Sequence, residues 1–271
     1  MSEMNSVTKD LLRAVSDWTG EFDGAYNIRQ DGGCVGRQSS KNIRIESKKD
    51  KPGLDILIAP GTKGESVYIP ACVTHGNVDD LVYNDFYVGE GADVTIVAGC
   101  GVHTETGEPA RHNGIHRFFL KPGSRVLYQE KHIGTGKGVG LRSIDPVTEA
   151  YLEENAVLEM DTAQIGGVDH TLRKTKATAA AGAKLRIRER ILRCAERKLP
   201  CMHVFCNTAF ANTCALYDPF IIGIDHMLKH CIGKDKIRQA CACADQLTVD
   251  DFHAPKKSKS LSQKAWKSDN S

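Results

Sequence analysis

Apolar and polar residues alternate in five short segments of the chain, and each segment opens with a glycine or an asparagine. Within each segment, apolar side chains occupy the fourth and sixth positions. The segments start at Gly64, Gly91, Gly123, Asn155 and Gly182, so they recur at intervals of 27, 32, 32 and 27 in the sequence numbering. Repetition at such a period is typical of stacked supersecondary units.

The alternation within each segment indicates a β-strand. Side chains two residues apart in a strand point to the same face, so Val94 and Ile96 share one face while Asp93 and Thr95 face water. The opening Gly or Asn tolerates a positive φ angle and lets the chain turn a corner. No helical pattern separates the strands, and a single coil cannot bury its apolar row alone. The sequence therefore predicts an all-β parallel solenoid, and an antiparallel β-sandwich is the alternative.

The pattern divides the chain into an N-terminal helix in residues 1–23, a solenoid in residues 24–192 and an atypical tail in residues 193–271. The tail holds two of the 25 glycines but seven of the ten cysteines, and its end is rich in Lys and Ser. We expect this tail to be partly helical or disordered. The N-terminal helix is expected to be capped by Ser6 or Thr8. Its apolar side is formed by Leu11, Leu12, Val15 and Trp18.

Composition narrows the classes of protein that the chain can belong to. The 271 residues are 41% apolar and 26% charged, with a net charge of +2, so charge alone does not indicate a nucleic-acid partner. No apolar run approaches the roughly 20 residues of a membrane span, and the first residues lack a secretory signal. We therefore expect a cytoplasmic protein without a nucleic-acid or membrane partner. Its cysteines are then mostly reduced and suited to metal or sulfur chemistry.

Cysteine and histidine residues suggest a metal site near the second and third repeats. Two Cys-x-x-His pairs lie about one coil apart in the sequence, and a His-x-x-x-His pair follows the second of them. Thiolate and imidazole ligands of this kind suit zinc, iron or an iron–sulfur cluster. In a stack, the two Cys-x-x-His pairs are expected on neighbouring coils of one face; the alternative is that these residues are buried or form ordinary hydrogen bonds. The six candidate ligands are Cys72, His75, Cys100, His103, His112 and His116.

Other polar groups fit known chemistry less well. His132 and His170 stand apart from the motifs and are interpreted as structural residues. The glycine-rich segment 134–140 matches neither the phosphate-binding nor the dinucleotide-binding pattern and is interpreted as a loop. No catalytic serine or metalloprotease pattern occurs, and we expect a protein that is not an enzyme. An acidic patch, interpreted as a solvated edge, consists of Asp79, Asp80 and Asp85.

Several longer stretches resemble one protein family. They are Val67 to Pro70, Val82 to Gly89, Ala98 to His103, His112 to Phe118 and Asn155 to Ile187. These stretches are similar to the SufB/SufD family, the scaffold proteins of iron–sulfur cluster assembly in the SUF system. The similarity is greatest to the short, single-scaffold members, and it covers about residues 24–192.

The resemblance implies a right-handed parallel β-helix that holds a transient iron–sulfur cluster. It also implies three partners: an ABC-type ATPase of the SUF system, a cysteine desulfurase as the sulfur donor, and a second scaffold subunit in a homodimer or heterodimer. Residues 193–271 do not match the family, so no ligand is assigned there, and we hypothesise that this tail is an out-of-frame or replaced end. A β-solenoid carbohydrate-active enzyme and a truncated, inactive interaction module are the alternatives.

Overall fold

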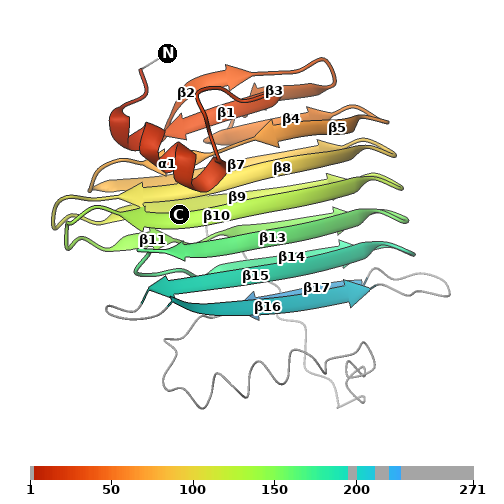
Figure 1. Cartoon of the computed structure of the whole chain (residues 1–271). Helices are drawn as coiled ribbons and strands as arrows, with labels where there is room; N and C mark the ends of the chain where they lie inside the picture. The colour runs from red at the N-terminus through yellow and green to blue at the C-terminus, as the bar shows by residue number, and fades with distance from the viewer. Residues whose placement is uncertain (1–2, 195–199, 211–219, 227–271) are drawn as a thin grey trace, which may run out of the picture.

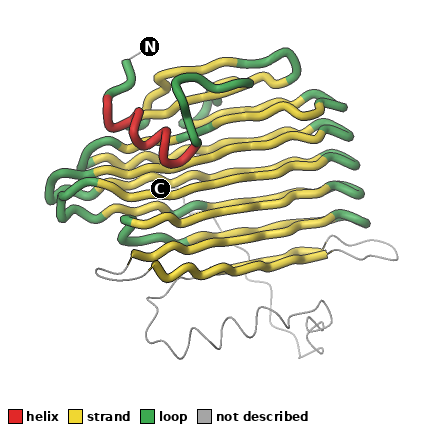
Figure 2. Tube along the Cα trace, viewed as in Figure 1, coloured by secondary structure: helices red, strands yellow, loops and turns green. Residues whose placement is uncertain are grey.

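The fold is a parallel β-solenoid made of two facing sheets, named here sheet A and sheet B (Figure 1). The computed structural model describes residues 3–194, 200–210 and 220–226, with side chains up to Arg190. The chain passes alternately through the two sheets, and each coil adds one long strand to each of them (Figure 2). The predicted solenoid is therefore confirmed, and the alternative of an antiparallel sandwich is wrong.

The strands of each sheet follow one another in space in nearly the order in which the coils follow in sequence. Sheet A contains, in spatial order, β16 (Pro200–Phe210), β15 (Lys184–Cys194), β13 (Val157–Gly166), β10 (Arg125–Thr135), β8 (Asp93–His103), β5 (Lys63–Tyr68), β1 (Ala25–Gln30) and β2 (Gly33–Gln38), with β6 (Ala71–Val73) beside β1 and β8. Sheet B contains β17 (Phe220–His226), β14 (Arg173–Ala179), β12 (Val147–Leu152), β9 (Ala110–Leu120), β7 (Val78–Val88), β4 (Gly53–Ile58) and β3 (Ile43–Ser47), with β11 (Arg142–Ile144) beside β9.

The five predicted corner residues all adopt a left-handed backbone conformation. This conformation is readily available to glycine and tolerated by asparagine, which explains why only these two residues open the repeats. Each corner lies at the start of a strand of sheet A, as the repeat predicts, and Gly64 is already the second residue of β5. The φ angles are 68° at Gly64, 64° at Gly91, 65° at Gly123, 58° at Asn155 and 69° at Gly182.

Apolar side chains from successive coils stack into columns between the sheets. Val126 of β10 pairs in parallel register with Val94 of β8 and with Leu158 of β13. Leu158 in turn pairs with Leu185 of β15, and all four side chains are at most 3% exposed. Each coil thus buries its apolar row against its neighbours, which is the stabilisation that a solenoid requires.

Antiparallel strands end the solenoid on both sides. At the N-terminal end, β2 pairs with β1 and β3 pairs with β4; at the C-terminal end, β16 pairs with β15 and β17 with β14. Strands β16 and β17 fall within residues 193–271, so both sheets extend beyond the predicted boundary. Arg193 and Cys194 still belong to β15, and the rest of the predicted tail lies outside the described residues.

Helix α1 (Ser6–Ser16) packs on the outer face of sheet A, against β6, β8 and β10 (Figure 1). The predicted caps are wrong by one residue or more, because Asn5 caps the helix by accepting a hydrogen bond from the Thr8 amide. Gly99 and Gly101 of β8 leave room for the helix, since a Cβ atom there would lie 2.6 Å from Val15 and 2.8 Å from Leu11. Within the described residues, no helix is long and apolar enough to cross a membrane.

Candidate metal centre

The interior between the sheets is apolar near the glycine corners, and its opposite half holds buried polar side chains beside a second, smaller apolar cluster that includes Cys100. Along β10, the inward side chains change from Val126 and Tyr128 to Glu130 and His132. The neighbouring strand β8 places Cys100 at the same level of the interior. Because the facing sheet excludes water, the polar atoms in this half must satisfy one another or bind a ligand.

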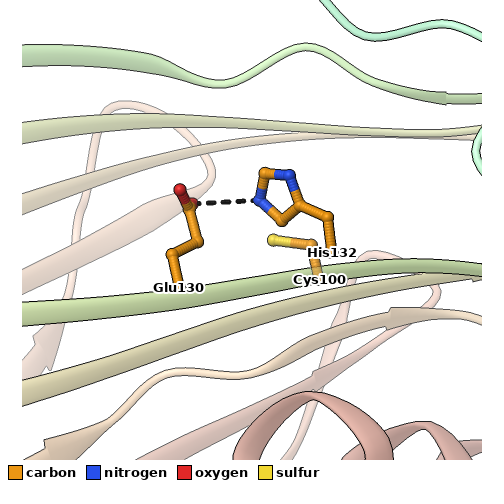
Figure 3. A group of neighbouring side chains, drawn as sticks. All are labelled: Cys100, Glu130 and His132. Atoms are coloured by element: carbon orange, nitrogen blue, oxygen red, sulfur yellow. Dashed lines mark ion pairs between the residues drawn. The ribbon is translucent and has the colours of Figure 1, made fainter. Parts of the chain in front are cut away.

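Cys100, Glu130 and His132 form a compact group in this polar half (Figure 3). Cys100 and His132 are direct partners in the register of β8 and β10, and Glu130 lies two residues before His132 on the same face. One potential ligand atom from each residue lies within 4.8 Å of the others. The three side chains are 4% exposed or less.

Glu130 is the most heavily bonded member of this group. Its Oε1 accepts a hydrogen bond of 2.9 Å from the Tyr128 hydroxyl, and its Oε2 accepts one of 2.6 Å from Nη2 of Arg173. The Nε2 atom of His132 lies 3.2 Å from Glu130 Oε1, close enough for an ion pair but without hydrogen-bond geometry. His132 Nε2 is thus a buried nitrogen without a hydrogen-bond partner among the described residues.

Burial and neighbouring charges act in opposite directions on the groups of this site. Burial favours a raised pKa for Glu130, but Arg173 and His132 outweigh it and hold that pKa well below its usual range. Burial, together with the Glu130 charge, raises the pKa of the Cys100 thiol well above its usual range. The group therefore contains a carboxylate and a protonated thiol.

A second polar cluster lies beside the first, with its acid and imidazole groups on strands of sheet B and Arg29 on β1 of sheet A. Asp80 accepts hydrogen bonds from Nε and Nη2 of Arg29 and lies 3.1 Å from Nδ1 of His112. His116 lies 2.8 Å from the Tyr128 hydroxyl, and burial lowers the pKa of His116 to about 4. His116 is consequently neutral at physiological pH and remains a possible ligand.

A small cavity lies between Cys100 and the second cluster. Its volume is about 20 Å³, room for about one water-sized atom, and Cys100, His112 and His116 contribute to its lining. Asn84 also lines it, and the buried Oδ1 atom of Asn84 has no hydrogen-bond partner among the described residues. The interior therefore offers both ligand atoms and a little space next to the Cys100 thiol.

The structure separates the six ligands predicted from the sequence. Cys100, His112 and His116 point into the interior. His103 lies at the end of β8, 2.9 Å from the Thr135 hydroxyl, and the His75 side chain is 65% exposed at the surface. The predicted set does not converge on one point.

Cys72 faces the opposite side of sheet A from Cys100, so the prediction that both pairs share one face is wrong. In the register of β6 and β8, Ala71 is the partner of Cys100 and Cys72 is the partner of Gly101. Adjacent residues of a strand point to opposite faces, so Cys72 points away from the interior that Cys100 enters. Cys72 is buried beneath α1, where its Sγ lies 4.0 Å from the Thr8 carbonyl oxygen.

The acidic patch also differs from its interpretation as a solvated edge. Asp80 is 3% exposed because it points inward to Arg29, and Asp85 is 1% exposed. Asp85 lies on the outer face, where Lys48 and Arg117 cover it through ion pairs.

The ligands predicted from the sequence do not include Glu130, and they do not include His132, which the sequence suggested to be structural. The missing signal was the coil period itself, because His132 follows Cys100 by the same interval that separates the corner residues Gly91 and Gly123. In a parallel stack, that spacing places two residues next to each other on the same face.

The residues present suit a transition-metal cation. A thiolate, an imidazole and a carboxylate are ligands of zinc and iron, whereas magnesium and calcium prefer oxygen ligands alone. The partnerless Nε2 atom of His132 and the enclosed position of Cys100 support this fit. Fold and site together define the class of this molecule: a parallel β-solenoid protein with an enclosed thiol, carboxylate and imidazole group.

No protein-family model and no curated protein matches the chain. The similarity to the SufB/SufD family therefore stays a prediction from the sequence.

Proposed function

We propose that this protein is a scaffold subunit of iron–sulfur cluster assembly. In this role it holds iron and sulfide as a nascent cluster, works with an ABC-type ATPase and a second scaffold subunit, and receives sulfur from a cysteine desulfurase. The observation that carries the proposal is the enclosed group of Cys100, Glu130 and His132. The solenoid fold agrees with the architecture implied by the resemblance.

The ligand types of this group suit a cluster that is bound for a time and then transferred to another protein. Clusters that stay in a protein are commonly held by four thiolates. Here a single thiol is combined with a carboxylate and an imidazole, which are harder ligands for iron than thiolate is. Such a mixed set binds iron while leaving the cluster to be transferred to a protein with more thiolates.

The proposal is tested by anaerobic purification after co-expression with the ATPase and the sulfur donor. We expect the wild-type protein to carry iron and acid-labile sulfide and to show the visible absorption of a cluster. The Cys100→Ser variant, which changes a buried thiol to a hydroxyl, is expected to lose most of both. Cys34→Ser is the matched control, because Cys34 lies exposed on the β1–β2 hairpin.

Two results count against the proposal. Wild-type protein without iron and sulfide under these conditions contradicts the assembly role. If Cys100→Ser carries as much iron and sulfide as wild type, the cluster is not bound at Cys100. The seven cysteines after residue 193 are then the next residues to replace.

A further inference from the structure

Arg173 crosses the interior from sheet B and contacts two carboxylates on sheet A. Its Nη2 atom donates a hydrogen bond of 2.6 Å to Glu130 on β10, and its Nε atom donates one of 3.0 Å to Glu189 on β15. Arg173, Glu130 and Glu189 are each at most 7% exposed. The remaining Nη1 atom of Arg173 is buried without a hydrogen-bond partner among the described residues.

The network holds more acidic groups than permanent cations. Two carboxylates, Glu130 and Glu189, share the single guanidinium of Arg173. Buried carboxylates need cationic partners in a water-free interior. A divalent cation bound by Cys100, Glu130 and His132 supplies a second cation to this network, and the Cys100 thiol then loses its proton to solvent.

We infer that Arg173 is an internal competitor of the metal: a divalent transition-metal cation that binds Cys100, Glu130 and His132 displaces Arg173 from Glu130, and Glu189 retains it. This inference rests on the proposed function, because it concerns the binding of metal at the same group. It assigns Arg173 and Glu189 as positioning residues, since neither supplies a ligand atom to the metal.

Repulsion between the two cations is the physical reason for the displacement. A metal on Glu130 and a guanidinium 2.6 Å from the same carboxylate repel each other at short range in a medium of low dielectric constant. Glu189 is already bonded to Arg173, so the guanidinium keeps a buried partner when it leaves Glu130. Removing Glu189 therefore hinders metal binding, whereas removing Arg173 promotes it.

The test is a titration of the metal-free full-length protein with Co²⁺ under anaerobic conditions. Thiolate ligation of Co²⁺ gives a charge-transfer absorption. The difference between the absorbance of wild type and that of Cys100→Ser measures binding at this site. We expect Glu189→Gln to bind Co²⁺ about tenfold more weakly than wild type, the scale on which groups bonded to metal ligands alter affinity. The double variant Arg173→Met/Glu189→Gln is expected to bind about tenfold more tightly than wild type.

The double variant avoids the unfolding that a lone Arg173→Met change risks, because it removes one charge of each sign. Its matched control is Arg186→Met/Glu159→Gln, which removes an ion pair of 2.9 Å between β13 and β15 on the outer face. We expect this control to leave Co²⁺ affinity unchanged, and circular dichroism to show folded protein for every variant.

Equal affinities of wild type and Arg173→Met/Glu189→Gln overturn the inference, and so does a wild-type protein without Cys100-dependent Co²⁺ binding. These outcomes are distinct from failure of the proposed function. If the Co²⁺ affinities follow the expected order but no cluster accumulates in the co-expression experiment, the assembly role fails and the competition by Arg173 stands.

Discussion

Replacement of Leu158 by alanine tests the stacked apolar column directly. The Leu158 side chain is fully buried, in register with Val126 on one side and Leu185 on the other. Alanine lacks three of its carbon atoms, and at roughly 0.8 kcal/mol per buried methylene the lost transfer free energy is about 2.4 kcal/mol. The cavity left between the neighbouring coils adds to this loss. We expect the free energy of unfolding to fall by about 3–4 kcal/mol.

Urea and thermal unfolding, followed by circular dichroism, measure this change. In a chain of this size, such a loss corresponds to a fall in the unfolding midpoint of about 10 °C. Leu127→Ala is the matched control, because Leu127 lies on β10 with its side chain on the outer face, 37% exposed. We expect Leu127→Ala to cost less than about 1 kcal/mol. Equal losses in the two variants refute the stacked column.

The position of the loss is a further part of this prediction. Each coil of a solenoid contacts only its neighbours, so the damage from Leu158→Ala is expected to remain local. Hydrogen exchange should accelerate in β10, β13 and β15 and change least in β1 and β4, which lie several coils away. Uniform acceleration throughout both sheets contradicts a nearest-neighbour stack.

Two further changes probe the packing of α1 and the buried charges. Gly99→Ala places a Cβ atom 2.6 Å from Val15, so we expect the free energy of unfolding to fall by about 1–3 kcal/mol and α1 to be cleaved faster by protease. Gly107→Ala is the control, because its Cβ atom meets nothing closer than 3.9 Å, and we expect no change in stability. Burial favours a raised pKa for Asp80, but His112 and Arg29 outweigh it and lower that pKa. The stabilisation by the Asp80 carboxylate is therefore full above about pH 5 and declines as the pH falls toward 2. The difference in unfolding free energy between wild type and Asp80→Asn should therefore shrink over that range; a constant difference in urea titrations at each pH contradicts the assigned ionisation.

The architecture could be predicted because it depends on local signals that repeat. A glycine such as Gly91 marks a corner through its positive φ angle, and the alternation of Val94 and Ile96 marks the inward face of the next strand. Both signals lie within a few residues of each other and recur in every coil. Periodicity then supplied the stacking order that a single strand does not contain.

The site was harder to predict because its partners are distant in sequence. An inward glutamate such as Glu130 has the same local pattern as a solvated one, and only Arg173, 43 residues later and on the opposite sheet, explains its burial. Cys72 shows a second difficulty. The register of β6 against β8 pairs Cys72 with Gly101 rather than with Cys100, and this shift by a single position reverses the face on which its thiol lies.

The interior of the middle coils has an apolar part and a part with buried charges, and the two have separable roles. Near the corners, residues such as Leu158 contribute stability through apolar contact with the coils on either side. Farther along the strands, Glu130 and Arg173 occupy the same interior with charges that are costly to bury. Stability alone does not account for them, since apolar side chains of similar size would stack at least as well. Substitution in the apolar part should therefore lower stability while Co²⁺ affinity persists, and Cys100→Ser should remove Co²⁺ binding from a protein that still unfolds near the wild-type temperature.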